Sequence, residues 1–252
     1  MPHLERNMNS SKTDYRKLYH IQDKFFKWWR NIEFPFYLTG GTALGRFYLN
    51  HRYSQDLDFF VNNDPRFLSY IKTIEKEIAK QFRLNLKEAL FTDEFTRMFI
   101  TADDLDLKIE FVNDVSHRSG SPVPSFFGLL DTPLNILSNK LGAIISREEP
   151  KDIFDIVHLS INYSFNWQTV FSESKEKSII NEIDVAERLS TFPPQLLENV
   201  DWNVTPVNLA QFSIILRQIA DDFLLGKDNS VCRVNNPITG AKPLNFREYK
   251  EF

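Results

Sequence analysis

Residues 37–61 read YLTGGTALGRFYLNHRYSQDLDFFV, and this stretch decides the fold. An apolar run over residues 34–39 ends at two glycines, a helical pattern covers residues 42–50, and a second apolar run covers residues 56–61. Short runs of aromatic and aliphatic residues that stop at turn-forming residues are typical of buried strands. The pattern predicts a strand, a tight turn, a helix and a second strand in direct succession.

The turn between the first strand and the helix has the chemistry of a phosphate site. Gly40 and Gly41 lack side chains, so a phosphate can approach their backbone closely. Thr42 adds a hydroxyl at the start of a helix, where free N–H groups and the positive end of the helix dipole favour an anion. Taken alone, a glycine pair after a strand is usually only a turn. The turn is therefore informative only together with the strand that follows.

That second strand carries two carboxylates. Asp56 and Asp58 are two residues apart, so both side chains project from the same face. They repel each other unless a cation lies between them, and Mg²⁺ is the usual cation between protein carboxylates and substrate phosphates. Such a pair is more often a solvated face, but Asp58 stands among the apolar residues Leu57 and 59–61. Together with the glycine turn, the pair favours a metal and phosphate site.

A third carboxylate would complete a two-metal site, in which two cations hold the attacking and leaving oxygens. Residues 105–112 alternate apolar and polar side chains, which is the clearest strand pattern in the chain. Asp106 and Glu110 share the polar face with Lys108, which we interpret as neutralising its neighbours. Glu110 is favoured as the third carboxylate because its neighbours are apolar, whereas Asp106 adjoins the acidic turn at residues 103–104.

A second polar cluster follows further along the chain. Lys140 and Arg147 are seven residues apart, which is two helical turns, so they can share one face. The next helix opens, just after a proline, with Lys151, Asp152 and Asp155. In a functional interpretation the first two bind the triphosphate and the other three shape the site. An acidic residue in a first helical turn also favours the helix dipole, which explains Asp152 as well. The sequence leaves both interpretations open.

The rest of the chain indicates an α+β protein. Helical periodicity predicts helices over residues 15–30, 65–82, 133–146, 151–163, 166–190 and 206–226, with strands over residues 84–91 and 96–101 and a loop over residues 119–125. Little strand pattern follows residue 131. We therefore predict a catalytic domain over residues 1–131 and a helical domain over residues 132–252 that contributes basic residues to the site.

Composition excludes several classes of protein. The 252 residues include 23 Phe, 8 Tyr and 4 Trp but only 8 Gly, which indicates a packed core and not disorder. A net charge of −4 gives no overall attraction to nucleic acid. Cys232 is the one cysteine, and the five histidines lack metal-ligand spacing. Because no apolar run has the length of a signal peptide core or a membrane span, we expect a cytoplasmic protein without membrane contact.

Taken together, these motifs resemble the nucleotidyltransferases of the AbiEii/AbiGii type, the toxin components of type IV toxin–antitoxin and phage-abortive systems. The likeness rests on the glycine turn, on the run His-Arg-x-Ser-x-Asp-Leu-Asp at residues 51–58, on the Lys-Ile-Glu strand at residues 108–110, and on the cluster from Lys140 to Asp155. It covers residues 34–160. Thr42 stands where serine is common, and Glu110 stands where aspartate is frequent, so the metal position could shift.

The resemblance implies a polymerase β-like nucleotidyltransferase core, a mixed sheet flanked by helices, followed by a helical C-terminal domain. It implies the transfer of a nucleoside monophosphate from a nucleoside triphosphate to an acceptor hydroxyl of RNA, tRNA or a protein. Asp56, Asp58 and Glu110 would hold two Mg²⁺ ions, with Mn²⁺ as a substitute. A cognate antitoxin is an implied partner.

Further roles follow from the same resemblance. The turn residues Gly40, Gly41 and Thr42 would hold the β- and γ-phosphates. The loop before the second strand would be braced by His51, Arg52 and Ser54, although His51 is equally well explained as a helix-end residue.

Two other interpretations compete with an active enzyme. The first is a catalytically silent module on the same fold that binds a nucleotide or a partner, and the intact pair Asp56 and Asp58 speaks against it. The second is an α/β scaffold whose acidic pair only decorates the surface. It is the weakest of the three, because burying Asp58 among apolar residues without a cation would be costly.

Overall fold

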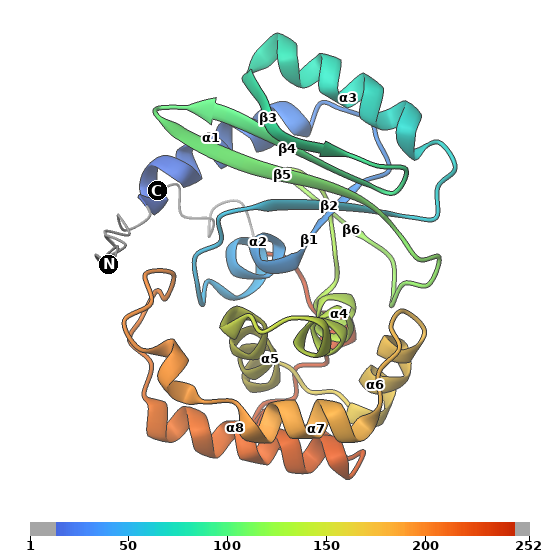
Figure 1. The fold of residues 1–252 in the computed structure, drawn as a ribbon. Coiled ribbons are helices and arrows are strands. Elements are labelled where there is room, and N and C mark those ends of the chain that lie inside the picture. The colour runs from blue at the N-terminus through green and yellow to red at the C-terminus, as the bar shows by residue number, and fades with distance from the viewer. Residues whose placement is uncertain (1–13, 245–252) are drawn as a thin grey trace, which may run out of the picture.

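The computed structural model describes residues 14–244, which form one seven-stranded mixed sheet with helices on both faces (Figure 1). The strand order is β3-β4-β5-β2-β1-β7-β6. The strands are β1 (Tyr37–Thr39), β2 (Leu57–Asn62), β3 (Arg83–Phe91), β4 (Phe95–Ala102), β5 (Leu105–Asp114), β6 (Val123–Ser125) and β7 (Gly128–Leu130). β2 pairs with β5 and β1 with β7 in parallel, and the other neighbours are antiparallel. The predicted α+β class is confirmed.

One face of the sheet is buried and carries aromatic side chains. The helices α1 (Tyr15–Trp29) and α3 (Phe67–Gln81) cover it, above the sheet in Figure 1. Every second residue of β2 is buried, and Phe59 stacks on Phe111 of β5 with ring centroids 5.5 Å apart. Trp29 of α1 lies 4.5 Å from the Phe59 ring. The period of two in these strands therefore sends the apolar side chains to this face and the polar ones to the other.

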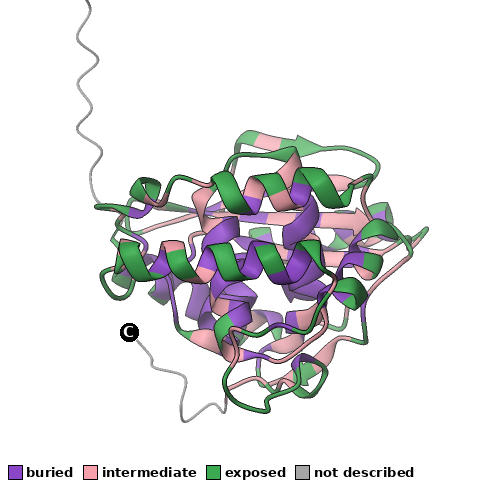
Figure 2. Ribbon diagram, turned by 90° about the horizontal axis from the view of Figure 1, so that it is seen from below, coloured by how far each residue is buried: buried purple, intermediate pink, exposed green. Residues whose placement is uncertain are grey.

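The opposite face meets the helical half of the chain, below the sheet in Figure 1. Its helices are α4 (Pro133–Ser146), α5 (Pro150–Asn162), α6 (Trp167–Lys175), α7 (Glu182–Thr191) and α8 (Leu209–Leu224), with single 3-10 turns at Pro194–Leu197 and Ile238–Gly240. α4 and α5 are largely buried, whereas α7 and α8 lie outermost and expose their outer sides, as the view from below in Figure 2 shows. The first turn after β1 is the short helix α2 (Gly40–Leu44), continued by a π-helix over Gly45–Leu49.

Several details differ from the sequence-based expectations, among them strand β7, which was not predicted. The single helix predicted over residues 166–190 is wrong, because α6 and α7 are separated by residues 176–181. Asn181 starts α7 by accepting a hydrogen bond from the Asp184 N–H, a cap that fixes a new helix start. The predicted loop at residues 119–125 contains strand β6. The helix after β1 begins at Gly40, two residues earlier than predicted.

The division of the chain at residue 131 stays a prediction. Buried apolar residues from both sides of that boundary belong to one continuous core. Within residues 14–244, no helix combines the length and the apolar character needed to cross a membrane.

Candidate active site

The polar face of the sheet and helix α4 enclose a cleft of about 720 Å³. Asp58 of β2 and Glu110 of β5 lie opposite each other in the parallel register and both line the cleft. Asp56 directly precedes β2, which begins at Leu57. The two halves of the chain thus meet where the sequence analysis predicts the acidic residues.

Two basic side chains hold the acidic residues in place. The Lys108 ammonium bridges Asp56 and Glu110, with Nζ at 2.9 Å from Asp56 Oδ2 and 3.3 Å from Glu110 Oε1. Arg97 of β4 donates from Nε to the same Glu110 oxygen at 2.7 Å. Burial lowers the pKa of Lys108, but the hydrogen bond to Asp56 and the charges of Asp56 and Glu110 outweigh it and raise the pKa. Lys108 therefore neutralises its neighbours, as its place on the strand indicates.

Asp58 is the carboxylate with the least favourable surroundings. Burial and the negative charges of Asp56 and Glu110 raise its pKa to about 7, against the smaller opposing effects of Lys108 and Lys140. A carboxylate in such surroundings gains from a bound cation, because the cation removes the repulsion that raises the pKa.

The three carboxylates supply the oxygen ligands that a hard cation such as Mg²⁺ prefers. Across residues 14–244 no histidine, cysteine or acidic residues are already gathered as a metal cluster, and Lys108 sits between two of the carboxylates as a cation. In their chemistry these donors fit a divalent ion, which would have to take the place of the Lys108 ammonium and draw the three carboxylates together. The assignment of Asp56, Asp58 and Glu110 as metal ligands stays a prediction.

The glycine turn is shaped by contacts that leave no room for side chains. Gly40 has φ +67°, and a Cβ atom there would meet Asp58 Oδ2 at 2.6 Å. At Gly41 a Cβ atom would meet the Arg52 guanidinium and, at 3.0 Å, Ser54 Oγ. Thr42 is fully buried, and its hydroxyl donates to the Asp56 carbonyl oxygen at 2.5 Å. The turn therefore brings its bare backbone beside Asp58, while the Thr42 hydroxyl fixes the start of the acidic strand.

Replacing Gly40 with alanine is expected to reduce nucleotidyl transfer at least about tenfold. The left-handed backbone strains an L-residue by roughly 1–2 kcal/mol, and the new methyl group would push the Asp58 carboxylate aside. The rate of transfer from a labelled nucleotide checks this. Gly240→Ala is the matched control, because a Cβ atom at Gly240 meets nothing within 4 Å. Equal rates for Gly40→Ala and wild type would contradict the close approach of the turn to Asp58.

Asp155 is the buried centre of the second polar cluster. It accepts two hydrogen bonds from Arg52, at 2.6 Å from Nε and 2.8 Å from Nη2, and one from His51 Nε2 at 2.8 Å. Lys140 Nζ lies 2.7 Å from its second oxygen. Burial would raise the pKa of Asp155, but the charges of Arg52 and Lys140 hold it well below the usual value. Asp155 thus braces the loop of residues 51–54 from below.

Asp152 continues this cluster toward the cleft. Its carboxylate accepts from Lys140 Nζ at 2.6 Å and from Arg147 Nε at 2.7 Å. Lys140 and Arg147 both line the cleft, although α4 ends at Ser146 and the backbone of Arg147 is extended, so Arg147 does not lie on the helical face that carries Lys140. Lys151 is not part of the ion-pair cluster: its ammonium lies 5.9 Å from the Trp202 ring, and burial followed by the charge of Arg52 lowers its pKa. Asp152 and Asp155 are therefore supports for basic side chains, and Lys151 stands apart.

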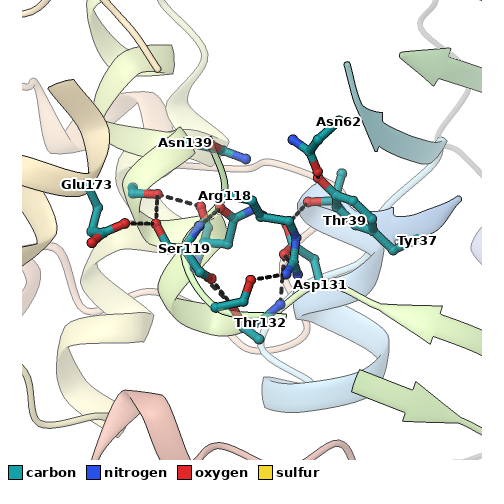
Figure 3. A network of polar contacts seen from close by, with 12 residues as sticks. Tyr37, Thr39, Asn62, Arg118, Ser119, Asp131, Thr132, Asn139 and Glu173 are labelled. Carbon is teal, nitrogen blue, oxygen red and sulfur yellow. Dashed lines mark hydrogen bonds and ion pairs between the residues drawn. The ribbon is translucent and has the colours of Figure 1, made fainter. Parts of the chain in front are cut away.

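A further polar network, centred on Asp131, was not predicted from the sequence. Asp131, fully buried between β7 and α4, accepts hydrogen bonds from Thr39 at 2.5 Å, Arg118 at 2.6 Å and Asn135 at 2.8 Å (Figure 3). Thr39 directly precedes the glycine turn. The Asp-Thr-Pro run at residues 131–133 could have indicated it, because Thr132 caps α4 and a proline occupies the first helical position. Arg97, Asn139 and Lys177, which also lie at the cleft or beside it, were missed because no local motif marks them.

A glycine turn beside paired carboxylates, opposite a helix that carries basic residues, is the arrangement of a nucleotidyltransferase. The model of the family described as nucleotidyl transferase AbiEii toxin of type IV toxin–antitoxin systems matches residues 32–222. The chain belongs to this family, and it is a nucleotidyltransferase by family. No match was found among curated proteins.

Solved structures share the fold. JHP933 from Helicobacter pylori is 20% identical, with a TM-score of 0.54 over 85% of this chain and 94% of that one. MenT4, a nucleotidyltransferase toxin from Mycobacterium tuberculosis, is 15% identical, with a TM-score of 0.57 over 85% of each chain. At these identities the likeness concerns the fold alone. It agrees with the mixed sheet and the helical C-terminal half expected from the sequence.

Proposed function

We propose that this protein transfers a nucleoside monophosphate from a nucleoside triphosphate to an acceptor hydroxyl of RNA, tRNA or a protein. The observation that carries the proposal is the single cleft in which Asp58 faces Glu110 across paired strands beside the bare backbone of Gly40 and Gly41. Two Mg²⁺ ions, held by these carboxylates and Asp56, would polarise the phosphate and activate the acceptor hydroxyl.

Different residues of the cleft bind different parts of the substrate. The backbone of Gly40 and Gly41 receives the terminal phosphates, and Lys140 on α4 and Arg147 directly after it supply positive charge from the opposite wall. Both basic side chains are already oriented by Asp152, so little side-chain freedom is lost when a phosphate binds.

The acceptor enters from the other side of the acidic residues. In-line displacement requires the attacking oxygen to approach opposite the departing pyrophosphate. The glycine turn follows β1, so the opposite direction along the sheet leads over β5 to β4, where Lys108 and Arg97 are partly exposed. Their positive charges suit a phosphate of an RNA acceptor. An antitoxin partner and a role as the toxin of a type IV system are further parts of this proposal, which rest on the family.

The test is transfer of label from each α-labelled nucleoside triphosphate, with Mg²⁺, to total tRNA or to protein extract. Wild type is expected to transfer label, and Glu110→Gln to lose about a hundredfold or more, because one ligand of the metal site loses its charge. Asp106→Asn is the matched control: Asp106 lies on the same strand but pairs with Thr101 at the exposed end of the hairpin.

The outcomes separate the hypotheses. Label transferred by wild type and Asp106→Asn but not by Glu110→Gln supports both the reaction and the choice of Glu110. Loss in Asp106→Asn with activity in Glu110→Gln would exchange the two roles. Mg²⁺–nucleotide binding without transfer to either acceptor class would favour the silent binding module.

A further inference from the structure

The end of the cleft away from Asp58 and Glu110 has a different chemistry. It lies near Asp114, which is four residues beyond Glu110 on β5 and therefore about 13 Å along the strand. α4 contributes Ile136 and Asn139 to the wall, and the connection between α6 and α7 contributes Lys177 and Ile180. This end combines apolar side chains with a few fixed polar groups, the Asp114 carboxylate among them, as is typical of sites that hold a small molecule in one orientation.

The hydrogen bonds of the Lys177 ammonium all go to oxygen atoms of neutral side chains. Nζ donates to Asn135 Oδ1, to Ser138 Oγ at 2.5 Å and to Asn139 Oδ1 at 2.9 Å. In the part of the chain that the structure describes, no carboxylate forms an ion pair with it within 4.0 Å. Burial lowers the pKa of Lys177 to about 8, against the attraction of the more distant Asp131, Asp114 and Glu173.

This arrangement fixes which way the Asn139 amide points. An ammonium has three donors and no acceptor, so Asn139 must turn its oxygen toward Lys177. The Asn139 nitrogen, with two N–H donors, is then directed away from the network, as the close view in Figure 3 shows. Among residues 14–244 this nitrogen donates to no other group. A polar donor thus faces the cleft in a fixed orientation.

The phosphate-binding turn and this end of the cleft are joined by the buried network. Lys177 donates to Asn135, Asn135 donates to Asp131, and Asp131 accepts from Thr39, the residue before the glycine turn. A triphosphate bound at the turn places its α-phosphate at the acidic residues, and the attached nucleoside must fill the space beside them. The end of the same cleft near Asp114 offers that space.

We propose that this end of the cleft is the nucleoside subsite, where Asn139 donates a hydrogen bond from Nδ2 to an acceptor atom of the base or ribose and Lys177 positions the amide. The inference rests on the proposed function, because it presumes that the phosphates occupy the glycine turn. Asn139 contacts the substrate, whereas Lys177 acts through Asn139.

The experiment compares the binding of two probes by calorimetry with Mg²⁺. The first is the set of four nucleoside triphosphate analogues with an α,β-methylene bridge, which cannot be transferred, and the second is inorganic tripolyphosphate. Asn139→Asp replaces the donor with an acceptor of the same shape. It is expected to weaken the preferred analogue about tenfold or more while changing tripolyphosphate affinity less than about threefold. Lys177→Met is expected to weaken the analogue in the same selective way, by about threefold to tenfold.

Asn31→Asp is the matched control, since it makes the same change of charge at an exposed asparagine after α1. Equal analogue affinity in Asn139→Asp and wild type, or equal losses for the analogue and tripolyphosphate, would overturn the nucleoside subsite alone. Wild type that binds neither probe would overturn the proposed function itself. A selective loss in Asn139→Asp and Lys177→Met, with Asn31→Asp unchanged, would support the subsite.

Discussion

Asp58→Asn is expected to reduce nucleotidyl transfer by about a thousandfold or more, the largest effect on activity that the structure predicts. Asp58 faces Glu110 across paired strands and lies beside the glycine turn, so it is the carboxylate shared by the phosphate and metal sides of the cleft. A loss of that size corresponds to about 4 kcal/mol in the activation free energy. Single-turnover transfer of an α-labelled nucleotide measures it.

The same substitution is expected to stabilise the protein in the absence of metal. Because the pKa of Asp58 is about 7, above the value of 3.8 for a free carboxyl, the folded state binds more protons than the unfolded state between these values. The free energy of unfolding of the wild type therefore falls as pH rises through this window. The Asp58→Asn variant does not show this loss, because asparagine has no carboxyl group that ionises. Urea unfolding in a chelator should show a stability gain for Asp58→Asn that is absent near pH 3.5 and grows up to pH 8.

Two controls test whether the gain in stability comes from the surroundings of Asp58. Asp106→Asn removes an exposed carboxylate of the same sheet and should show no gain of this kind. Adding Mg²⁺ at pH 8 should shrink the gain, because the ion stabilises only the protein that retains Asp58. A variant that is inactive but no more stable at pH 8 than wild type would contradict the unfavourable surroundings assigned to Asp58.

Asp155→Ala is expected to lower the free energy of unfolding by about 3–5 kcal/mol, the largest effect on stability. Asp155 is fully buried and neutralises the buried side chains of Arg52 and Lys140, besides accepting from His51. Its removal takes away the carboxylate that pairs with the buried Arg52 guanidinium, whereas Lys140 keeps its ion pair with Asp152. Chemical unfolding at pH 7 checks the prediction, with Asp155→Asn as a second variant that keeps the shape of the side chain but not its charge.

The control is Glu148→Ala. The Glu148 side chain is 80% exposed and pairs with Arg188 at 2.9 Å, so its loss should cost less than about 1 kcal/mol. Similar losses for Glu148→Ala and Asp155→Ala would show that the buried cluster contributes no more than a surface ion pair.

The sequence predicts best what depends on local spacing. The period of two in residues 105–112 places Glu110 on the face where the structure has it, opposite Asp58, because strand alternation is a property of neighbouring residues. The glycine turn follows from the same reasoning. Which of Asp106 and Glu110 is catalytic still depends on the experiment, although only Glu110 lines the cleft.

What the sequence does not show depends on residues far apart in the chain. Thr39 and Asp131 are 92 residues apart, and Arg52 and Asp155 are 103 apart, so no local pattern could pair them. Arg97 becomes a partner of Glu110 only through the register of β4 against β5. The break at residues 176–181, which brings Lys177 to the cleft, was hidden because helical periodicity runs on through both helices.

The Asp155 ion pairs also bear on how the cleft can move. Asp155 belongs to α5, while Arg52 and His51 belong to the loop that leads into β2. These hydrogen bonds therefore connect the sheet to the helices at one edge of the cleft. A rotation of the sheet away from the helices would break the buried ion pairs of Asp155. We therefore expect substrates to enter and products to leave by small shifts of side chains at the rim of the cleft, without rotation of the sheet against the helices.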